Sequence, residues 1–128
     1  MSTSTLAEIY RGYIDCLNKQ DWPSLGRFVD DNVSYNGQRV GLSGYRDMLV
    51  RDFEAIPGLS FTIDFIVADG PRLGSRLLFD CTPKGQLFGF PVNGRRVAFT
   101  ENVFYEFAEG RIIAVWSVID KAAIEAQL

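Results

Sequence analysis

Asp120 is the clearest candidate for a catalytic residue, because it is a carboxylate at the end of an otherwise apolar and aromatic stretch, Arg111 to Ile119. A carboxyl group among apolar side chains loses hydration, so its neutral form is favoured and its pKa rises towards neutral pH. Such a group can take a proton from carbon or donate one to a carbonyl oxygen. We therefore predict Asp120 as a catalytic acid/base.

A structural role for Asp120 is the alternative. Aspartate is a favoured N-cap, and the residues that follow, Lys121 to Leu128, include several helix formers. The spacing alone supports a helix cap and a pocket acid equally well.

Amide and phenol side chains could stabilise the negative oxygen that forms when such an acid/base enolises a carbonyl compound. Asn102 and Tyr35 are the candidates for this role, and Tyr13 is a third. Two of them also have a structural interpretation: Asn102 as a hydrogen-bonded residue of a strand, and Tyr13 as part of the buried face of a helix.

Histidine is absent from the 128 residues, which excludes Ser-His-Asp and Cys-His nucleophiles and histidine-based metal sites. The net charge is -3 and the basic residues form no aromatic-interleaved patch, so we expect no nucleic-acid partner. No apolar run approaches the ~20 residues that span a bilayer, so we expect no membrane association. Cys16 and Cys81 lack metal or redox spacing and predict buried thiols in a reducing, cytoplasmic compartment.

Three helices are expected in the first half of the chain. Apolar residues recur at helical spacing from Leu6 to Leu17, and Trp22-Pro23 opens a short second helix. Ser43 caps a third helix that runs to about Ile56 and is ended by Pro57-Gly58.

The hydrophobic pattern then changes from helical to alternating. It predicts strands over Phe61–Val67 and Arg76–Thr82, and two long strands joined by a turn at Ala108–Gly110. A short strand at Val33–Tyr35, ended by the turn signal Asn36-Gly37, precedes the third helix. Helices followed by long antiparallel strands predict an α+β fold, and the length of 128 residues fits one domain, residues 1–128.

Both faces of the last hairpin are largely apolar. If Phe107 lies opposite Arg111, then Phe104 lies opposite Ala114 and shares a face with Trp116. We expect this face to line a ligand pocket, because apolar walls with a few polar groups are typical of such sites. It carries Thr100, Asn102, Phe104, Ala114, Trp116, Val118 and Asp120.

The opposite face is more uniformly apolar and is the expected subunit interface. The helices can cover only one face of the sheet, so the other face needs a partner. A homodimer packed sheet to sheet through the outer face is the expected solution. The residues of this predicted interface are Phe99, Glu101, Val103, Tyr105, Phe107, Ile113, Val115, Ser117 and Ile119.

The order of elements and two segments resemble the SnoaL-like polyketide cyclases, also called ester cyclases, of the nuclear transport factor 2-like superfamily. The segments are Phe88-Gly89-Phe90-Pro91-x-x-Gly94-Arg95-Arg96-Val97 and Glu109-Gly110-Arg111-Ile112-x-x-x-Trp116-x-x-x-Asp120. The resemblance implies a cone-shaped, curved antiparallel sheet with three N-terminal helices enclosing a hydrophobic pocket, commonly in a dimer. It also implies ring closure of an aromatic polyketide by intramolecular aldol condensation, without metal or organic cofactor.

In that family the aspartate four residues after the tryptophan is the general acid/base. The resemblance places this role at Asp120 and makes Trp116 the pocket tryptophan, while family members often carry histidine around Tyr35, where this chain has none. The expected function is cofactor-free aldol-type cyclisation or isomerisation of a hydrophobic, carbonyl-bearing small molecule. A non-catalytic small-molecule binding protein on the same fold is the alternative. Water addition to an epoxide, a third possibility, would need two inward carboxylates bridged by an arginine.

Overall fold

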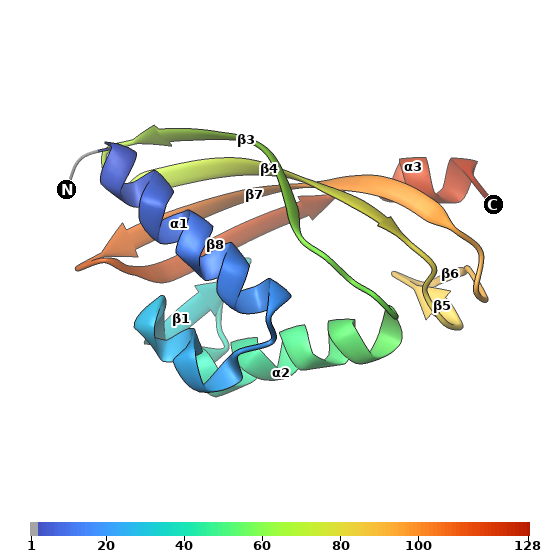
Figure 1. The fold of residues 1–128 in the computed structure, drawn as a ribbon, viewed down its shortest axis with the longest axis horizontal. Coiled ribbons are helices and arrows are strands. Elements are labelled where there is room, and N and C mark those ends of the chain that lie inside the picture. Colours follow the sequence, from blue (N-terminus) through green and yellow to red (C-terminus); the bar gives the residue numbers. More distant parts are fainter. Residues whose placement is uncertain (1–2) are drawn as a thin grey trace.

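The computed structural model describes residues 3–128 and contains the three expected N-terminal helices in the expected order (Figure 1). The segments with alternating apolar residues form strands, and a last short helix follows them. The helices are α1 (Thr3–Asn18), the 3-10 helix η1 (Trp22–Arg27), α2 (Gly41–Ala55) and α3 (Lys121–Ala126).

The strands form one six-stranded sheet and one small separate pair. The order in the main sheet is β2-β1-β8-β7-β4-β3, and every pairing is antiparallel except that of β1 with β8. These strands are β1 (Val29–Tyr35), β2 (Gln38–Arg39), β3 (Thr62–Asp69), β4 (Arg72–Cys81), β7 (Val97–Ala108) and β8 (Arg111–Ile119), and the small pair is β5 (Gln86–Leu87) with β6 (Phe90–Pro91).

Two of the predicted turns form with positive φ at both central residues, which suits Asn36-Gly37 and Gly110 but is strained for Glu109. Asn36 and Gly37 have φ values of 49° and 86° and connect β1 to β2. Glu109 and Gly110 have φ values of 52° and 79° and connect β7 to β8. Positive φ at both central residues matches the twist of a hairpin and is strained for most residues other than glycine, asparagine and aspartate.

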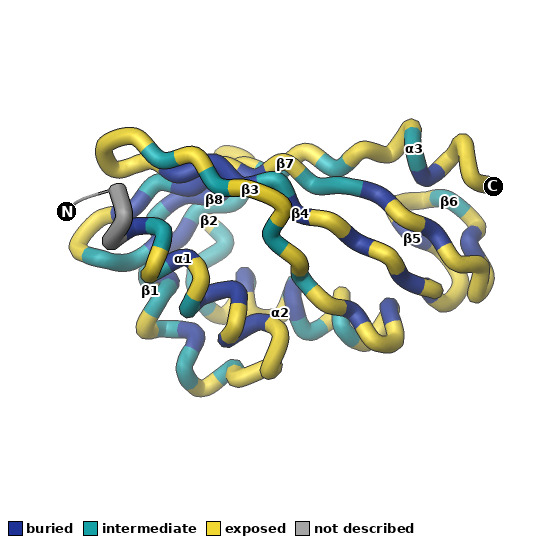
Figure 2. Tube along the Cα trace, turned by 45° about the horizontal axis from the view of Figure 1, so that its top comes forward, coloured by how far each residue is buried: buried dark blue, intermediate teal, exposed yellow. Residues whose placement is uncertain are grey.

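The helices α1 and α2 lie on the concave side of the curved, unclosed sheet, which confirms the predicted α+β fold (Figure 1). Fully buried side chains from α1 meet those of β4 in the core, among them Tyr10, Leu17 and Leu77. Burying a leucine of this kind contributes roughly 1.5–3 kcal/mol. In Figure 2 the buried residues accordingly gather where α1 faces the strands, while β3 is mostly exposed or half-buried.

The register of the last hairpin differs from the prediction. Its turn contains two residues, so Ala108 pairs with Arg111, and an irregularity after Phe107 then moves the pairing by one more residue. As a result Phe104 lies opposite Trp116. The two shifts of one residue add up to an even number. Most residues therefore stay on the face of the sheet that was predicted for them.

The assignment of those two faces was wrong. Phe104, Trp116 and Val118 lie on the outer, uncovered side of the sheet and are 56%, 40% and 66% exposed. Val103 and Tyr105, from the predicted interface face, are instead buried beneath the helices. The alternating pattern identifies which residues share a face, but here both faces are apolar, so hydrophobicity did not show which one the helices cover.

Two further expectations can be compared with the structure. Cys16 and Cys81 are both buried and free of disulfides. Within residues 3–128, none of the helices combines the length and apolar character needed to cross a bilayer.

Candidate functional site

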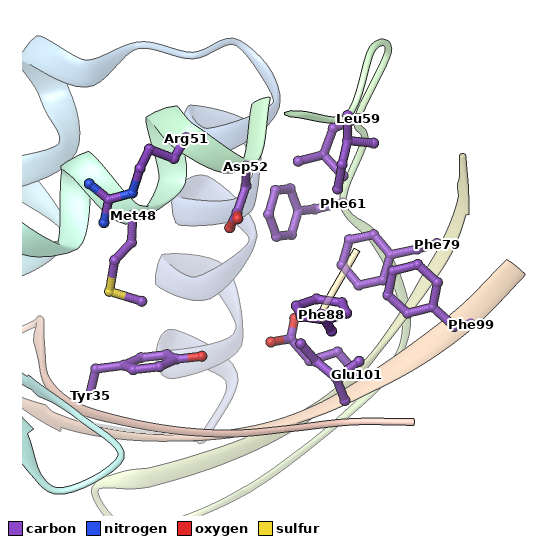
Figure 3. A pocket seen from close by; sticks show the side chains of 12 residues that line it. Tyr35, Met48, Arg51, Asp52, Leu59, Phe61, Phe79, Phe88, Phe99 and Glu101 are labelled. Atoms are coloured by element: carbon purple, nitrogen blue, oxygen red, sulfur yellow. The ribbon is translucent and has the colours of Figure 1, made fainter. Parts of the chain in front are cut away.

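A cavity of about 260 Å³ opens between α2 and the concave side of the sheet (Figure 3). Aromatic side chains form one of its sides, and two carboxylates, a tyrosine and a methionine project into the remaining space. The lining residues are Tyr35, Met48, Arg51, Asp52, Ile56, Leu59, Phe61, Phe79, Phe88, Phe99, Glu101 and Ile119.

One face of α2 supplies the roof of this cavity. Tyr45, Met48 and Asp52 stand at helical spacing, three and then four residues apart, so their side chains point the same way. The first of these is buried and the other two line the cavity. The helix therefore holds a carboxylate in line with its own apolar stripe.

Glu101 projects from β7 into the same cavity because the inward residues of the strand alternate with outward ones. The Ser117 hydroxyl, on the neighbouring strand β8, donates a short hydrogen bond to its carboxylate. Burial raises the pKa of Glu101 above its ordinary value; the hydrogen bond from Ser117 opposes this rise, and the charge of Asp52 adds to it. Glu101 is thus a desolvated carboxylate with a defined orientation.

Asp52 lies across the cavity from Glu101, at the end of α2 (Figure 3). Removal of water by the cavity wall raises its pKa from 3.8 to about 6, and the positive charge of Arg51 opposes the rise. Asp52 is exposed as a whole residue, but it lines both the cavity and the space next to it. Asp52 can therefore exchange a proton with a ligand close to neutral pH.

The aromatic side of the cavity is a connected group of rings. Phe79 and Phe99 stack with their centroids 5.1 Å apart, and Phe61 meets Phe79 edge to face at 5.3 Å. Phe88, from the loop between β5 and β6, contacts Phe99 and is 41% exposed. Such a wall suits a planar apolar ligand, because offset and edge-to-face ring contacts are favourable.

A smaller inner chamber of about 60 Å³ continues from the cavity towards α1. It shares Tyr35, Asp52 and Glu101 with the outer cavity and adds three buried phenols, Tyr13, Tyr45 and Tyr105. Its remaining walls are Leu17, Met48, Leu49, Phe61, Leu77, Val103 and Val115. The two carboxylates therefore stand where an apolar compartment meets a phenol-lined one.

The model of the SnoaL-like polyketide cyclase family matches residues 7–128 of the sequence. The chain belongs to this family. No match was found among curated proteins. The crystal structure of a SnoaL-like polyketide cyclase from Agrobacterium tumefaciens is 57% identical, with a TM-score of 0.95 over 99% of this chain and 98% of that one. TsrD from Streptomyces laurentii shares the fold at 20% identity, with a TM-score of 0.86 over 99% and 96% of the two chains.

Of the seven site residues predicted for this SnoaL-like protein, two line the cavities. Tyr35 borders both compartments and Tyr13 borders the inner one. The others, Asn102, Phe104, Trp116, Val118 and Asp120, belong to the outer side of the sheet and border neither compartment. The roles predicted for Tyr35 and Tyr13 in binding a substrate stay predictions.

Asp120 takes the structural position that was the alternative interpretation. It is the N-cap of α3, and its Oδ1 accepts a hydrogen bond of 3.1 Å from the backbone N–H of Ala123. Its side chain is exposed and borders shallow grooves on the outer face of the sheet. The expected apolar, desolvated environment is therefore missing at this position.

Sequence reasoning did not single out Glu101 and Asp52, the two carboxylates of the cavity. Both carried a signal: Asp52 follows the spacing of the apolar stripe of its helix, and Glu101 alternates with apolar residues of its strand. A carboxylate at a position that the pattern marks as buried is unusual and indicates a partnered or functional group.

Two further features limit the chemistry of the site. Figure 3 shows the guanidinium of Arg51 directed away from the carboxyl group of Asp52, and in the described part of the chain no ion pair joins them. Arg76 and Asp80 do lie beside Asp120 along a shallow outer groove, but Arg76 pairs with Asp64 and Asp80 with Arg96. Among the ion pairs of the described residues, no arginine bridges two carboxylates as water addition to an epoxide would need. Among residues 3–128, no three cysteine, aspartate or glutamate side chains converge as they would around a metal ion.

Proposed function

We propose that this SnoaL-like protein is an acid/base enzyme that removes an α-proton from an apolar, carbonyl-bearing small molecule, with Glu101 as the base. The observation that carries the proposal is the position of Glu101: a desolvated carboxylate oriented by Ser117, between an aromatic wall and a set of phenols. A base of this kind gains reactivity because water does not compete for its lone pairs.

The reaction begins when the Glu101 carboxylate takes a proton from the carbon next to the carbonyl. The C–H electron pair becomes the C=C bond of an enolate, and the π electrons of the carbonyl move to its oxygen. The enolate carbon can then attack a second carbonyl of the same molecule, which closes a ring, or it can be protonated again, which gives an isomer. The family description as polyketide cyclases favours ring closure.

Asp52 suits the role of the acid in the ring-closing step. The attacked carbonyl becomes an alkoxide and needs a proton, and the pKa of about 6 keeps a fraction of Asp52 protonated near neutral pH. Two carboxyl groups in different surroundings can divide base and acid roles between them.

The test measures exchange of an α-proton for deuterium in acetophenone, a simple apolar ketone, by NMR in D₂O. Glu101→Gln keeps the size of the side chain and removes the base, so exchange should fall by about 10²–10⁴-fold. Glu106→Gln is the matched control, because Glu106 lies on the same strand β7 and pairs with Arg72 outside the cavity. Equal exchange rates in wild-type protein and Glu101→Gln would refute the role of Glu101.

Saturable binding of acetophenone without any exchange would instead support the alternative function, a non-catalytic binding protein. In that protein the two carboxylates would only orient the ligand.

We also propose that two copies of the chain pair through the outer side of the sheet. Large apolar residues are exposed on this side, and a monomer would leave them in water. They are Phe65, Val67, Leu78, Phe104, Trp116 and Val118. A cytoplasmic location fits the two free, buried thiols and is part of the same proposal.

A further inference from the structure

We infer that the inner chamber is a carbonyl subsite in which the hydroxyl pair of Tyr13 and Tyr45 donates a hydrogen bond to the substrate oxygen, and that the ligand is a small aryl ketone or similar compound. The inference deepens the proposed function and rests on it for the chemical step alone. The binding geometry stands on separate observations.

The first observation is a count of protons. The hydroxyl oxygens of Tyr13 and Tyr45 are 2.6 Å apart, so one hydroxyl donates to the other. Two phenols carry two protons, and this contact uses one of them. Within residues 3–128 neither hydroxyl has another hydrogen-bond partner. Whichever phenol donates, one O–H remains available beside the chamber.

The second observation is the location of this pair. Tyr13 comes from α1 and Tyr45 from α2, both are at most 4% exposed, and both border the inner chamber. A buried donor without an acceptor is costly, and a ligand oxygen would satisfy it. Burial also raises the pKa of both phenols above the ordinary value, so they remain donors at any pH at which the protein would work.

The third observation is that Glu101 borders the same chamber. With the carbonyl oxygen on the phenol pair, we expect the neighbouring carbon to lie towards Glu101, since this carboxylate lines the same chamber. When the carboxylate takes the α-proton, negative charge moves to the carbonyl oxygen, where the hydrogen bond becomes stronger. A donor fixed where charge develops accelerates the step without needing to reorient.

The volumes of the two compartments indicate the size of the ligand. The inner chamber of about 60 Å³ equals roughly the share of two water molecules in the liquid, which is room for an acetyl-sized group and too little for a ring. The outer cavity of about 260 Å³ is at the lower end of the ~300–1,000 Å³ typical of small-molecule sites. We therefore expect the aromatic ring of the ligand to lie in the outer cavity, against the packed wall of Phe61, Phe79, Phe88 and Phe99.

Acetophenone labelled with ¹³C at the carbonyl is the probe for the subsite. Bound to the wild-type protein, its carbonyl stretching band should move to lower frequency in difference infrared spectra, because a phenol donates to the oxygen. Each single Phe variant keeps one phenol O–H free, so the test removes both: Tyr13→Phe/Tyr45→Phe should reverse most of this movement. It should also slow α-proton exchange by about 10²-fold, the effect of losing one oxyanion donor. The dissociation constant should change much less than the exchange rate, because the hydrogen bond strengthens on the enolate.

Tyr10→Phe is the matched control. Tyr10 is as buried as the pair and its hydroxyl lies 3.3 Å from that of Tyr105, but it borders neither compartment. Loss of the Tyr10 hydroxyl should leave both the carbonyl band and the rate of α-proton exchange nearly unchanged. Thermal unfolding of the double variant and of Tyr10→Phe separates a lost hydrogen bond from a lost fold.

Two results would overturn the inference: absence of saturable binding by acetophenone, or a carbonyl band that is the same in wild-type protein and in the double variant Tyr13→Phe/Tyr45→Phe. Failure of the proposed function has a different signature. If the wild-type protein shifts the carbonyl band but exchanges no α-proton, the subsite is supported and the catalytic role of Glu101 is refuted.

Discussion

At the scale of single residues, Glu101 and Asp52 are the two carboxylates of the cavity although they come from β7 and α2. The charge of Asp52 raises the pKa of Glu101, and the two groups border both compartments. The pKa of Asp52 rises through its own desolvation, and the charge of Arg51 opposes that rise. A pH profile of α-proton exchange would therefore report on both carboxyl groups together.

Asp52 should make the folded protein less stable as the pH rises. Its pKa is about 6 in the fold against an ordinary value of 3.8, so the folded state binds the proton more tightly than the unfolded state. The stabilising contribution of the bound proton is complete below the unfolded-state pKa and is lost as the pH rises through the folded-state pKa. Urea unfolding between about pH 4 and pH 7 should show this decline, and Asp52→Asn should flatten it.

Asp80 serves as the control, because its contribution to stability changes with pH in the opposite direction. Its ion pair with Arg96 lowers the pKa of its carboxyl group, so its contribution is present at high pH and is lost as the pH falls. Asp80→Asn should therefore leave the decline between about pH 4 and pH 7 in place. If Asp52→Asn declined as steeply as the wild type, the desolvation of Asp52 would be disproved.

The sequence indicated only part of the site at this scale. Tyr35 and Tyr13 could be proposed because a phenol is a plausible donor wherever it meets a pocket, and both do border the cavities. Glu101 could not be separated from its apolar neighbours without knowing which side of its strand is covered. Its hydrogen bond from Ser117 also depends on the register between β7 and β8.

At the scale of elements, local signals predicted the presence and order of the helices and turns, because each depends on a few adjacent residues. The predicted cap at Ser43 was wrong, since α2 begins at Gly41 with Val40 as its N-cap. The sheet was harder. The extra residue in the β7–β8 pairing, and a second irregularity between Ile63 and Phe65 in the β3–β4 pairing, change register without any marked sequence signal. After the latter, Phe65 lies on the outer side and is 53% exposed. Bulges depend on how two strands pair, and the hydrophobic periodicity of one strand carries no information about that pairing.

The start of α3 permits a direct comparison of the two interpretations of Asp120. As a cap, the side chain satisfies the N–H of Ala123, so Asp120→Ala should cost about 1 kcal/mol of stability. Asp120→Asn should cost little, because asparagine is also a good N-cap. Both variants should exchange the α-protons of acetophenone at the wild-type rate. Chemical denaturation and the NMR exchange assay check the two expectations.

Loss of exchange in Asp120→Asn with unchanged stability would restore the catalytic role that the sequence suggested. The structure gives this side chain a position outside both compartments, so we expect stability alone to respond.

At the scale of the whole molecule, the fold could be predicted because the order of three helices and long strands, together with two segments of the chain, resembles one family. The match over residues 7–128 confirms that resemblance. The ligand could not be predicted in the same way. Its compartments combine side chains of α1, α2, β1, β4, β7 and β8, and their volume follows from packing that no local motif encodes.

The outer side of the sheet should determine the assembly state. Trp116→Lys places a charge in the centre of the exposed apolar residues, which should convert a dimer into a monomer. Ser43→Lys, an exposed position of α2 on the opposite side of the molecule, should leave the dimer intact. Sedimentation equilibrium of the wild type and both variants checks this. A monomeric wild type at all accessible concentrations would exclude the proposed pairing.

The carboxyl pair of the cavity has a consequence for spectroscopy. In most proteins the imidazole rings change state between pH 5 and 8 and overlap with any active-site signal there. This chain has no imidazole, and the pKa of Asp52 is about 6. A carboxyl band that changes near pH 6 is therefore expected from Asp52, free of any overlapping imidazole signal, and it would report the protonation of the proposed acid directly.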